Sequence, residues 1–257
     1  LRDAEKEHIE SIKEKNRALA ELNEVKNRFV GMVAHDLRNP LGSIGSLAEL
    51  LLESKGTLPW AEQQDLLQMI DSVCTDLVKM VHDILDVSVI ESGNLELNYR
   101  MGGLDELISE RIRIFESIAA KKRIRLELQL QAPRQFEFDR GKIAQVVDNL
   151  ISNAIKFSPP DRTVFIGSTL SDGMAKVNVK DQGPGLSIED QGRLFVHFQK
   201  LSARPTAGES STGLGLAIVR RMIEAHQGKL WVESTLGEGA VFLFELPMER
   251  KPDGRAG

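Results

Sequence analysis

Cysteine is almost absent from this 257-residue sequence, which contains only Cys74. A single cysteine excludes an internal disulfide and fits a reducing compartment. Cys74 falls within a helical pattern, so we expect it to fill a small space in a core. Aromatic residues make up only 5% of the chain, and no apolar run approaches the roughly 18–20 residues that span a bilayer. This composition is typical of a soluble, helix-rich globular protein.

The sequence also lacks a strong excess of either charge, since its formal net charge is −5. It therefore has no basic footprint for nucleic acid or for an anionic membrane, and we expect neither partner for this fragment. No signal peptide is visible. The sequence opens on Leu1 inside a helical pattern. We interpret it as a fragment whose upstream part has been removed, which leaves membrane attachment of the parent protein open.

One long amphipathic helix is predicted over residues 29–52, and His35, with Asp36 beside it, should lie at the edge of its apolar stripe or on its outer face. Pro40 removes one backbone donor and should kink or loosen that turn. Residues 1–28 continue the helical spacing with Glu and Lys between sparse apolar positions, which predicts a short two-stranded coiled coil or, as the alternative, a solvated single helix. The stripe of the long helix consists of Val30, Val33, Leu37, Leu41, Ile44, Leu47 and Leu51.

A turn at residues 54–60 separates this helix from a second one over residues 61–92. Together they predict an antiparallel helical hairpin over residues 29–92. One hairpin offers each apolar stripe a single partner helix, whereas two hairpins would bury both stripes in a four-helix bundle. We therefore expect a homodimer formed through residues 1–92.

The hydrophobic period changes after a linker at residues 93–103. Strands then alternate with helices, which predicts a compact α/β sandwich over residues 104–247, with helices on one face of one sheet. We expect a mobile loop at 196–212 and a disordered tail at 248–257. The expected helices cover residues 104–121, 139–157 and 213–228, and the expected strands cover residues 124–130, 136–138, 163–170, 174–181, 229–234 and 240–246.

Two asparagines four residues apart, Asn149 and Asn153, share one face of the predicted helix 139–157. Their amide oxygens can hold a hard cation such as Mg²⁺ without neutralising it. Lys156 follows within a turn and can meet a phosphate as a point charge. The alternative is an ordinary polar surface, although two asparagines inside a helix lower its intrinsic propensity.

Two glycine-rich segments complete the candidate site. Asp181 follows a predicted strand and can accept a hydrogen bond from an adenine amino group, while Gly183 and Gly185 allow close approach of the backbone. The segment Gly213-Leu214-Gly215 enters a helix, where free N–H groups favour phosphate. Alone, each segment is equally typical of an ordinary turn, and the second one lacks the Gly-Lys-Ser/Thr of a P-loop.

The order and spacing of these motifs behind the His-bearing hairpin resemble those of the two-component sensor histidine kinases. His-Asp-Leu-Arg-Asn-Pro at 35–40 resembles the family's H-box, with Asp36 where many members carry Glu. Residues 148–157 resemble its N-box, residues 181–186 and 213–218 its glycine boxes, and residues 194–198 its phenylalanine box. The resemblance implies an α+β multidomain fold, in which a dimeric four-helix bundle precedes a two-layer α/β sandwich of the Bergerat (GHKL) type.

The resemblance further implies an enzyme, a protein histidine kinase that transfers a phosphoryl group from ATP to His35 and then to an aspartate of a response regulator. Neutral imidazole is the attacking form, and Asp36 would accept the other ring proton. Asn39 matches the family position that orients water, so a phosphatase activity toward the regulator is also expected. The kinase portion should face the cytoplasm, where ATP is found.

The same resemblance assigns roles at the nucleotide. Asn149 and Asn153 would hold Mg²⁺ on the phosphates. Lys156 and the N–H groups near Gly213, Leu214 and Gly215 would stabilise the negative charge of the γ-phosphoryl group during its transfer. Asp181 would read adenine, with Gly183 and Gly185 shaping the wall of the pocket.

Two other functions remain as alternatives. One is a gyrase- or chaperone-like ATPase on the same sandwich, which would lack the His-bearing hairpin. The other is a dimeric scaffold that binds nucleotide without chemistry, against which the intact motifs argue. His82, His197 and His226 have no second ligand at metal-binding spacing, so we expect no zinc site and only structural roles for them.

Overall fold

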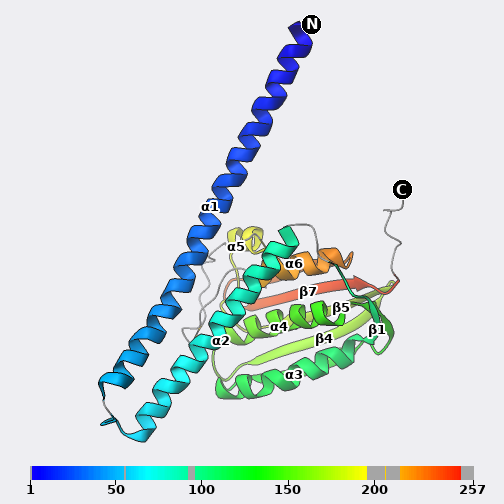
Figure 1. Ribbon diagram of the computed structural model, residues 1–257. Coiled ribbons are helices and arrows are strands. Elements are labelled where there is room, and N and C mark those ends of the chain that lie inside the picture. The colour runs from blue at the N-terminus through cyan, green and yellow to red at the C-terminus, as the bar shows by residue number, and fades with distance from the viewer. Residues whose placement is uncertain (1, 55, 92–95, 196–205, 207–214, 250–257) are drawn as a thin grey trace. The chain divides into compact units, whose positions relative to one another are not determined.

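The computed structural model describes residues 2–54, 56–91, 96–195, 206 and 215–249. The chain divides into two compact units, Leu1–His82 and Asp83–Gly257 (Figure 1). Within the described ranges, no helix combines the length and the apolar character that crossing a membrane requires.

Two helices make up the first unit, α1 (Arg2–Glu53) and α2 (Trp60–Glu91), and the last residues of α2 belong to the second unit. Their connection is closed by hydrogen bonds from Ser54 Oγ to the Leu51 carbonyl (2.7 Å) and from the Thr57 N–H to the Ser54 carbonyl (2.8 Å). The predicted helical hairpin and its turn are therefore confirmed. Helix α1 continues without a break through Pro40, because proline removes only its own N–H from the ladder while the flanking turns remain helical.

Cys74 is exposed on α2, so the prediction that it fills a core in this chain is wrong. Its neighbours Val73 and Leu77 are half-buried, and Cys74 lies beside the stripe that they form. Residue type alone suggested burial, whereas the helical phase of position 74 places it outside the stripe.

A five-stranded sheet forms the centre of the second unit, with strand order β2-β4-β5-β7-β6. Strands β2 and β4 are parallel, and the other neighbours are antiparallel. Buried and less buried residues alternate along β5, where Ala175, Val177 and Val179 face the core. The strands are β2 (Arg125–Gln131), β4 (Thr163–Ser171), β5 (Met174–Lys180), β6 (Lys229–Thr235) and β7 (Gly239–Pro247).

Three helices cover one face of this sheet, α3 (Leu104–Lys121), α4 (Arg140–Phe157) and α6 (Gly215–Ala225) (Figure 1). The apolar stripe of α4 recurs at three- and four-residue steps and is fully buried between the sheet and the neighbouring helices. This arrangement confirms the predicted two-layer α/β sandwich. The buried stripe consists of Ile143, Val146, Val147, Leu150, Ile151 and Ala154.

A second, two-stranded sheet was not predicted. Strand β1 (Arg100–Gly103) pairs antiparallel with β3 (Gln135–Phe138), so the last residues of the segment 93–103 belong to the α/β unit and not to a linker. The segment Met-Gly-Gly shows no apolar alternation, and it becomes a strand only through pairing with a distant partner.

A short helix, α5 (Ile188–Arg193), was also missed. Ser187 caps it, because the Ser187 Oγ accepts a hydrogen bond from the Asp190 N–H at 3.1 Å. Ser followed three residues later by a carboxylate is a recognised helix start, so the signal was present in the sequence.

The remaining predicted elements agree with the structure to within a few residues. Residues 1–28 are helical from Arg2 onward, and their packing as a two-stranded coiled coil stays a prediction. The loop 196–212, apart from Thr206, and most of the tail 248–257 lie outside the described residues.

Candidate nucleotide and phosphoacceptor sites

His35 and Asp36 form a hydrogen-bonded pair on α1. The His35 Nδ1 lies 3.0 Å from the Asp36 Oδ1, and 64% of the His35 side chain is exposed, against 24% for Asp36. A carboxylate only accepts hydrogen bonds, so we assign the ring hydrogen of neutral His35 to Nδ1. The lone pair on Nε2 is then available to an electrophile from solvent.

Asn39 lies one turn after His35, on the same side of α1. Its side chain is exposed, and its carbonyl accepts a hydrogen bond from Ser43 Oγ at 3.2 Å. Because Pro40 has no N–H, the Asp36 carbonyl lacks its usual helical donor at this turn. The structure therefore places all three residues predicted for the hairpin, His35, Asp36 and Asn39, in one short stretch of exposed helix.

Asp181 is the most deeply buried carboxylate of the candidate site, with 4% of its surface exposed. Its Oδ1 accepts hydrogen bonds from the N–H groups of Gly183 (2.8 Å) and Ala240 (3.1 Å). Burial raises the pKa of the Asp181 carboxyl, and the two backbone hydrogen bonds oppose that rise. In the described part of the chain no donor reaches Oδ2, which is therefore free to accept a hydrogen bond from a ligand.

The backbone is packed closely around Asp181. A Cβ on Gly183 would lie 2.8 Å from the Phe157 carbonyl oxygen, and one on Gly185, where φ is +68°, would lie 2.1 Å from the Thr235 carbonyl oxygen. Gly239, with φ +92°, leaves room for the Asp181 carbonyl, which a Cβ would approach to 2.3 Å. Only glycine fits these three positions. Sequence analysis named Gly183 and Gly185 but missed Gly239, because its contact with Asp181 depends on the pairing of β5 with β7.

Asn149 lies in the middle of α4, with 7% of its surface exposed. Its Nδ2 donates to the Gln145 carbonyl at 3.0 Å, which fixes Oδ1 as the outward acceptor. The first residue of α6, Gly215, approaches this oxygen so closely that a Cβ would lie 2.7 Å from it. The Asn149 Oδ1 is a buried amide oxygen, and the absence of a side chain on Gly215 keeps the space beside it open. Such an oxygen is a suitable ligand for Mg²⁺ on bound phosphates.

The other predicted α4 residues lie on the same helix. Asn153 is half-buried one turn after Asn149, and Lys156 is half-buried in the last turn. Thr206 and the Lys122 ammonium hold this end of α4, because both donate to the Lys156 carbonyl, at 3.1 and 2.7 Å. The site residues of α4 are thus carried on a helix whose carbonyl end is capped by more distant parts of the chain.

The structure brings the N-box and both glycine boxes together. Gly215 meets Asn149 on α4, and the Phe157 carbonyl at the end of the same helix meets Gly183 beside Asp181. Gly213 and Leu214 lie outside the described residues. A buried acceptor at one end of a helix and amide oxygens along it form a surface whose chemistry suits a nucleotide.

An α/β sandwich with this site, in a chain that also carries a helical hairpin with an exposed His–Asp pair, defines an ATP-binding protein of the histidine kinase class. Two family models match the chain: the His Kinase A (phospho-acceptor) domain over residues 25–93, and the Histidine kinase-, DNA gyrase B-, and HSP90-like ATPase over residues 138–250. The chain belongs to the two-component sensor histidine kinase family. The phospho-acceptor match sets it apart from a gyrase- or chaperone-like ATPase.

Individual relatives agree with this assignment. The circadian input-output histidine kinase CikA of Synechococcus elongatus is 33% identical over 229 residues, which cover 88% of this chain and 30% of that protein. The catalytic domain of histidine kinase ThkA is 33% identical, with a TM-score of 0.53 over 59% of this chain and 96% of that one. The structure of ThkA in complex with the response regulator protein TrrA is 29% identical, with a TM-score of 0.64 over 89% of this chain and 63% of that one. The chain thus spans less than a third of the length of CikA.

Proposed function

We propose that this chain transfers the γ-phosphoryl group of ATP to Nε2 of His35, and then to an aspartate on the receiver domain of a response regulator. The observation that carries the proposal is the 3.0 Å contact between His35 Nδ1 and Asp36 Oδ1. This contact selects the tautomer in which Nε2 is the nucleophile. Membership in the histidine kinase family supports the same reaction.

In the first step, the Nε2 lone pair forms a bond to the γ-phosphorus while the bond from that phosphorus to the bridging oxygen breaks. ADP leaves with the electron pair of that bond. The ring becomes positively charged, since Nδ1 keeps its hydrogen. The Asp36 carboxylate, hydrogen-bonded to that hydrogen, offsets the charge.

The nucleotide would be held by the second unit. Asp181 Oδ2 would accept a hydrogen bond from the adenine amino group, while Gly183, Gly185 and Gly239 allow the close backbone packing that holds Asp181 in place. Because the Asp181 Oδ1 already takes two backbone N–H groups, the carboxylate cannot turn freely, and a base that presents an acceptor in place of the amino group is rejected.

The phosphates would lie along α4 and the start of α6. The amide oxygens of Asn149 and Asn153 would hold Mg²⁺, with Lys156 as a point charge nearby. When bound, Mg²⁺ neutralises phosphate charge and orients the γ-phosphoryl group. The N–H groups of Gly213, Leu214 and Gly215 complete the phosphate site in this proposal.

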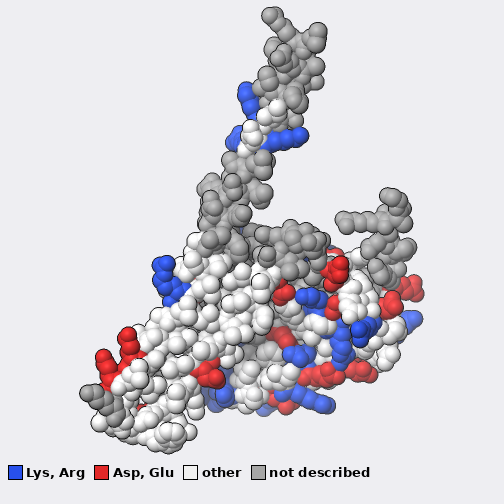
Figure 2. Space-filling view, viewed as in Figure 1, with Lys and Arg blue, Asp and Glu red and all other residues white. Residues whose placement is uncertain are grey.

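The hairpin would form the homodimer through residues 1–92. Large apolar side chains remain exposed on it, and Figure 2 shows a mostly white surface over the hairpin, with acidic side chains at its edge near the connecting loop. Exposure of so many apolar side chains on one hairpin indicates a partner surface. They are Leu41, Leu50, Leu52, Leu67, Met69, Val78 and Val81.

A receiver domain is the proposed second partner. ThkA was solved in complex with response regulator TrrA, which supports a regulator as the partner for this chain. Asn39 is exposed one turn from His35, where it can orient water toward a phosphorylated regulator, so we include a phosphatase activity in the proposal. Because ATP is the substrate, we place this activity in the cytoplasm.

We assign residues 1–28 to a signalling coiled coil, 29–92 to the phosphotransfer hairpin and 248–257 to a tail. The ATP-binding domain then runs to residue 247. Its start moves from residue 104 to Arg100, because β1 pairs with β3 inside this domain.

The direct experiment is incubation with γ-labelled ATP and Mg²⁺ of the wild type, His35→Ala and Asp181→Asn, followed by acid and base washes. We expect acid-labile, base-stable label on the wild type alone. His35→Ala should still bind ATP, and Asp181→Asn should bind it at least about tenfold more weakly. Label on His35→Ala equal to that on the wild type would overturn the assignment of His35, and an unlabelled wild type that binds ATP would point to a scaffold.

A further inference from the structure

His226 is a buried histidine for which the proposed reaction has no use. It directly follows α6, and 3% of its surface is exposed. Its Nδ1 lies 2.7 Å from the Met222 carbonyl oxygen, and its Nε2 lies 3.1 Å from the backbone nitrogen of Asp139. A carbonyl only accepts, so we assign the ring hydrogen to Nδ1 and the acceptor role to Nε2. Neutral His226 therefore joins the end of α6 to the residue that starts α4.

Asp139 is itself fully engaged. As the N-cap of α4, it accepts from the Lys142 N–H through Oδ1 (3.0 Å) and from the Asn98 N–H through Oδ2 (2.8 Å). Its own backbone N–H lies outside the helical ladder, and His226 is the acceptor for it. Since the site is buried, removal of that acceptor would leave an unsatisfied N–H at the start of α4.

Helices α4 and α6 pack against each other, and two specific contacts are spaced almost equally along the pair. At one place Gly215 meets Asn149, and at the other His226 meets Asp139. Asp139 and Asn149 on the α4 side are ten residues apart, and Gly215 and His226 on the α6 side are eleven residues apart. Both separations correspond to about 15–17 Å of α-helix. Because a helix of this length is rigid along its axis, a slide of α6 at the His226 end moves Gly215 against Asn149 by the same amount.

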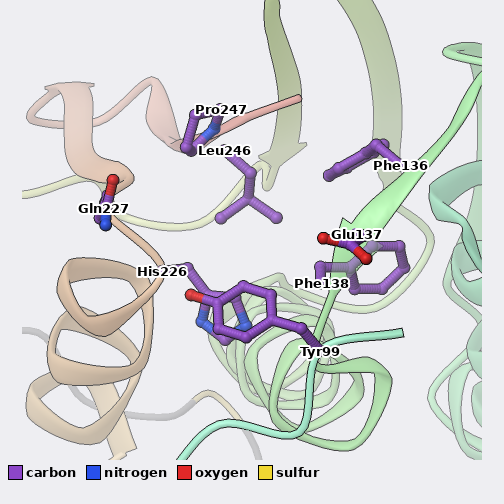
Figure 3. Close-up of a pocket in the computed structure, with 8 residues that line it drawn as sticks. All are labelled: Tyr99, Phe136, Glu137, Phe138, His226, Gln227, Leu246 and Pro247. Atoms are coloured by element: carbon purple, nitrogen blue, oxygen red, sulfur yellow. The ribbon is translucent and has the colours of Figure 1, made fainter. Parts of the chain in front are cut away.

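The segment that enters the domain lies against the same histidine. The Tyr99 ring centroid is 5.5 Å from that of His226, at an interplanar angle of 57°. Figure 3 shows the two rings side by side at a small cavity that Phe138 and Leu246 also line. Glu137 and Gln227 also line this cavity. The imidazole is thus buried among mostly apolar and aromatic groups, where its two hydrogen bonds fix its position.

We propose that His226 is a positioning residue for the phosphate end of the nucleotide site: its hydrogen bond from Asp139 fixes α6 along α4 and thereby holds Gly215 at Asn149. This inference rests on the proposed function, which places Mg²⁺ and phosphates at Asn149. It predicts that the effect is confined to that end of the nucleotide. Adenine recognition at Asp181 depends on β5 and β7, which His226 does not join.

Two amide variants of the full chain test the proposal. His226→Gln keeps an acceptor oxygen near the position of Nε2, whereas the shorter amide of His226→Asn can keep only the donor to Met222. We expect His226→Asn to weaken Mg·ATP binding about tenfold, and His226→Gln to stay within about twofold of the wild type. Adenosine, which has no phosphate, should bind all three proteins equally. In His35 phosphorylation, KM for ATP should rise in His226→Asn more than kcat falls.

Calorimetric titration with Mg·ATP and, separately, with adenosine supplies the measurement. Equal weakening of Mg·ATP binding by both variants, or the same loss for adenosine as for Mg·ATP, would overturn the positioning role in favour of general destabilisation. The readout is binding, so a wild type that binds Mg·ATP without labelling His35 refutes the proposed function and still decides the role of His226. A wild type that does not bind Mg·ATP overturns both.

Discussion

Gly215 lies so close to Asn149 that a Cβ on Gly215 would come within 2.7 Å of the Asn149 amide oxygen. In Gly215→Ala the Asn149 side-chain amide must move its oxygen away from the new Cβ. The amide nitrogen is held by its hydrogen bond to the Gln145 carbonyl, so the oxygen is the atom that shifts. We expect Mg·ATP affinity to fall at least about tenfold while thermal stability changes little, because alanine is the better helix former. Titration calorimetry and a thermal melt of the same sample check this.

Gly192 supplies the matched control for that prediction. It lies in α5, and a Cβ built on it meets nothing within 4 Å. Gly192→Ala should therefore leave Mg·ATP affinity and His35 labelling at wild-type values. If both alanine variants lose affinity alike, the contact between Gly215 and Asn149 does not control the phosphate site.

Asp181→Asn should separate stability from binding. The amide oxygen can still accept from Gly183 and Ala240, while the acceptor Oδ2 becomes an amide nitrogen that donates. Burial already raises the pKa of Asp181, so a neutral side chain suits the site and we expect unfolding stability to be kept or increased. ATP and adenosine affinity should both fall at least about tenfold, as for a lost hydrogen bond to a charged acceptor. Unchanged adenosine affinity would show that Asp181 does not read the base.

Asp36→Asn isolates the charge of the carboxylate from its hydrogen bond. The amide oxygen can still accept from His35 Nδ1, yet it no longer offsets the positive ring of the phosphorylated product. We expect kcat for His35 labelling to fall about a hundredfold, within the usual range for loss of an acid–base partner. The affinity for Mg·ATP should stay at its wild-type value. A labelling rate close to that of the wild type would reduce Asp36 to a hydrogen-bond acceptor.

The pH dependence of stability should contain a contribution from His226. Burial lowers the pKa of this imidazole, against opposing effects of Met222 and Asp139. As the pH falls below about 6.5, the unfolded chain binds a proton that the folded chain does not, so the free energy of unfolding declines until the lowered pKa is reached. His226→Gln should lose this decline. Urea unfolding between about pH 5 and 8, followed by Trp231 fluorescence in a Trp60→Phe background, measures it.

Two bidentate ion pairs of similar geometry should differ in their effect on stability. Arg111 and Asp148 join α3 to α4 at 2.7 and 2.6 Å with 27% and 29% of their side chains exposed, and the pKa of Arg111 is raised by this contact. Arg123 and Asp161 meet at 2.8 Å with 68% and 66% exposed. Double-mutant cycles should give a coupling of about 1 kcal/mol for the first pair and no measurable coupling for the second, because solvent screens exposed charges. A larger coupling for the exposed pair would contradict this.

Much of the fold followed from patterns that are local in sequence. Helical periodicity predicted α1, α2, α3 and α4, and alternation predicted β2, β4 and β5, because these patterns state which residues of one element share a face. Strand β1 and helix α5 were not predicted. The Met-Gly-Gly of β1 shows no hydrophobic period, and a six-residue helix is too short to reveal a helical period.

The candidate site likewise has features that local sequence patterns predict and features that only the tertiary structure shows. His35, Asp36, Asn149, Asn153 and Asp181 were predicted as site residues from residue type, from their spacing along single elements and from the family resemblance. Such spacing within one or two turns can be recognised in the sequence. That Gly239 leaves room for the Asp181 carbonyl, that Gly215 meets Asn149, and that His226 joins α6 to α4 were decided only by the tertiary structure. Those contacts join residues far apart in sequence, and they arise from strand register and helix packing, which no local pattern specifies.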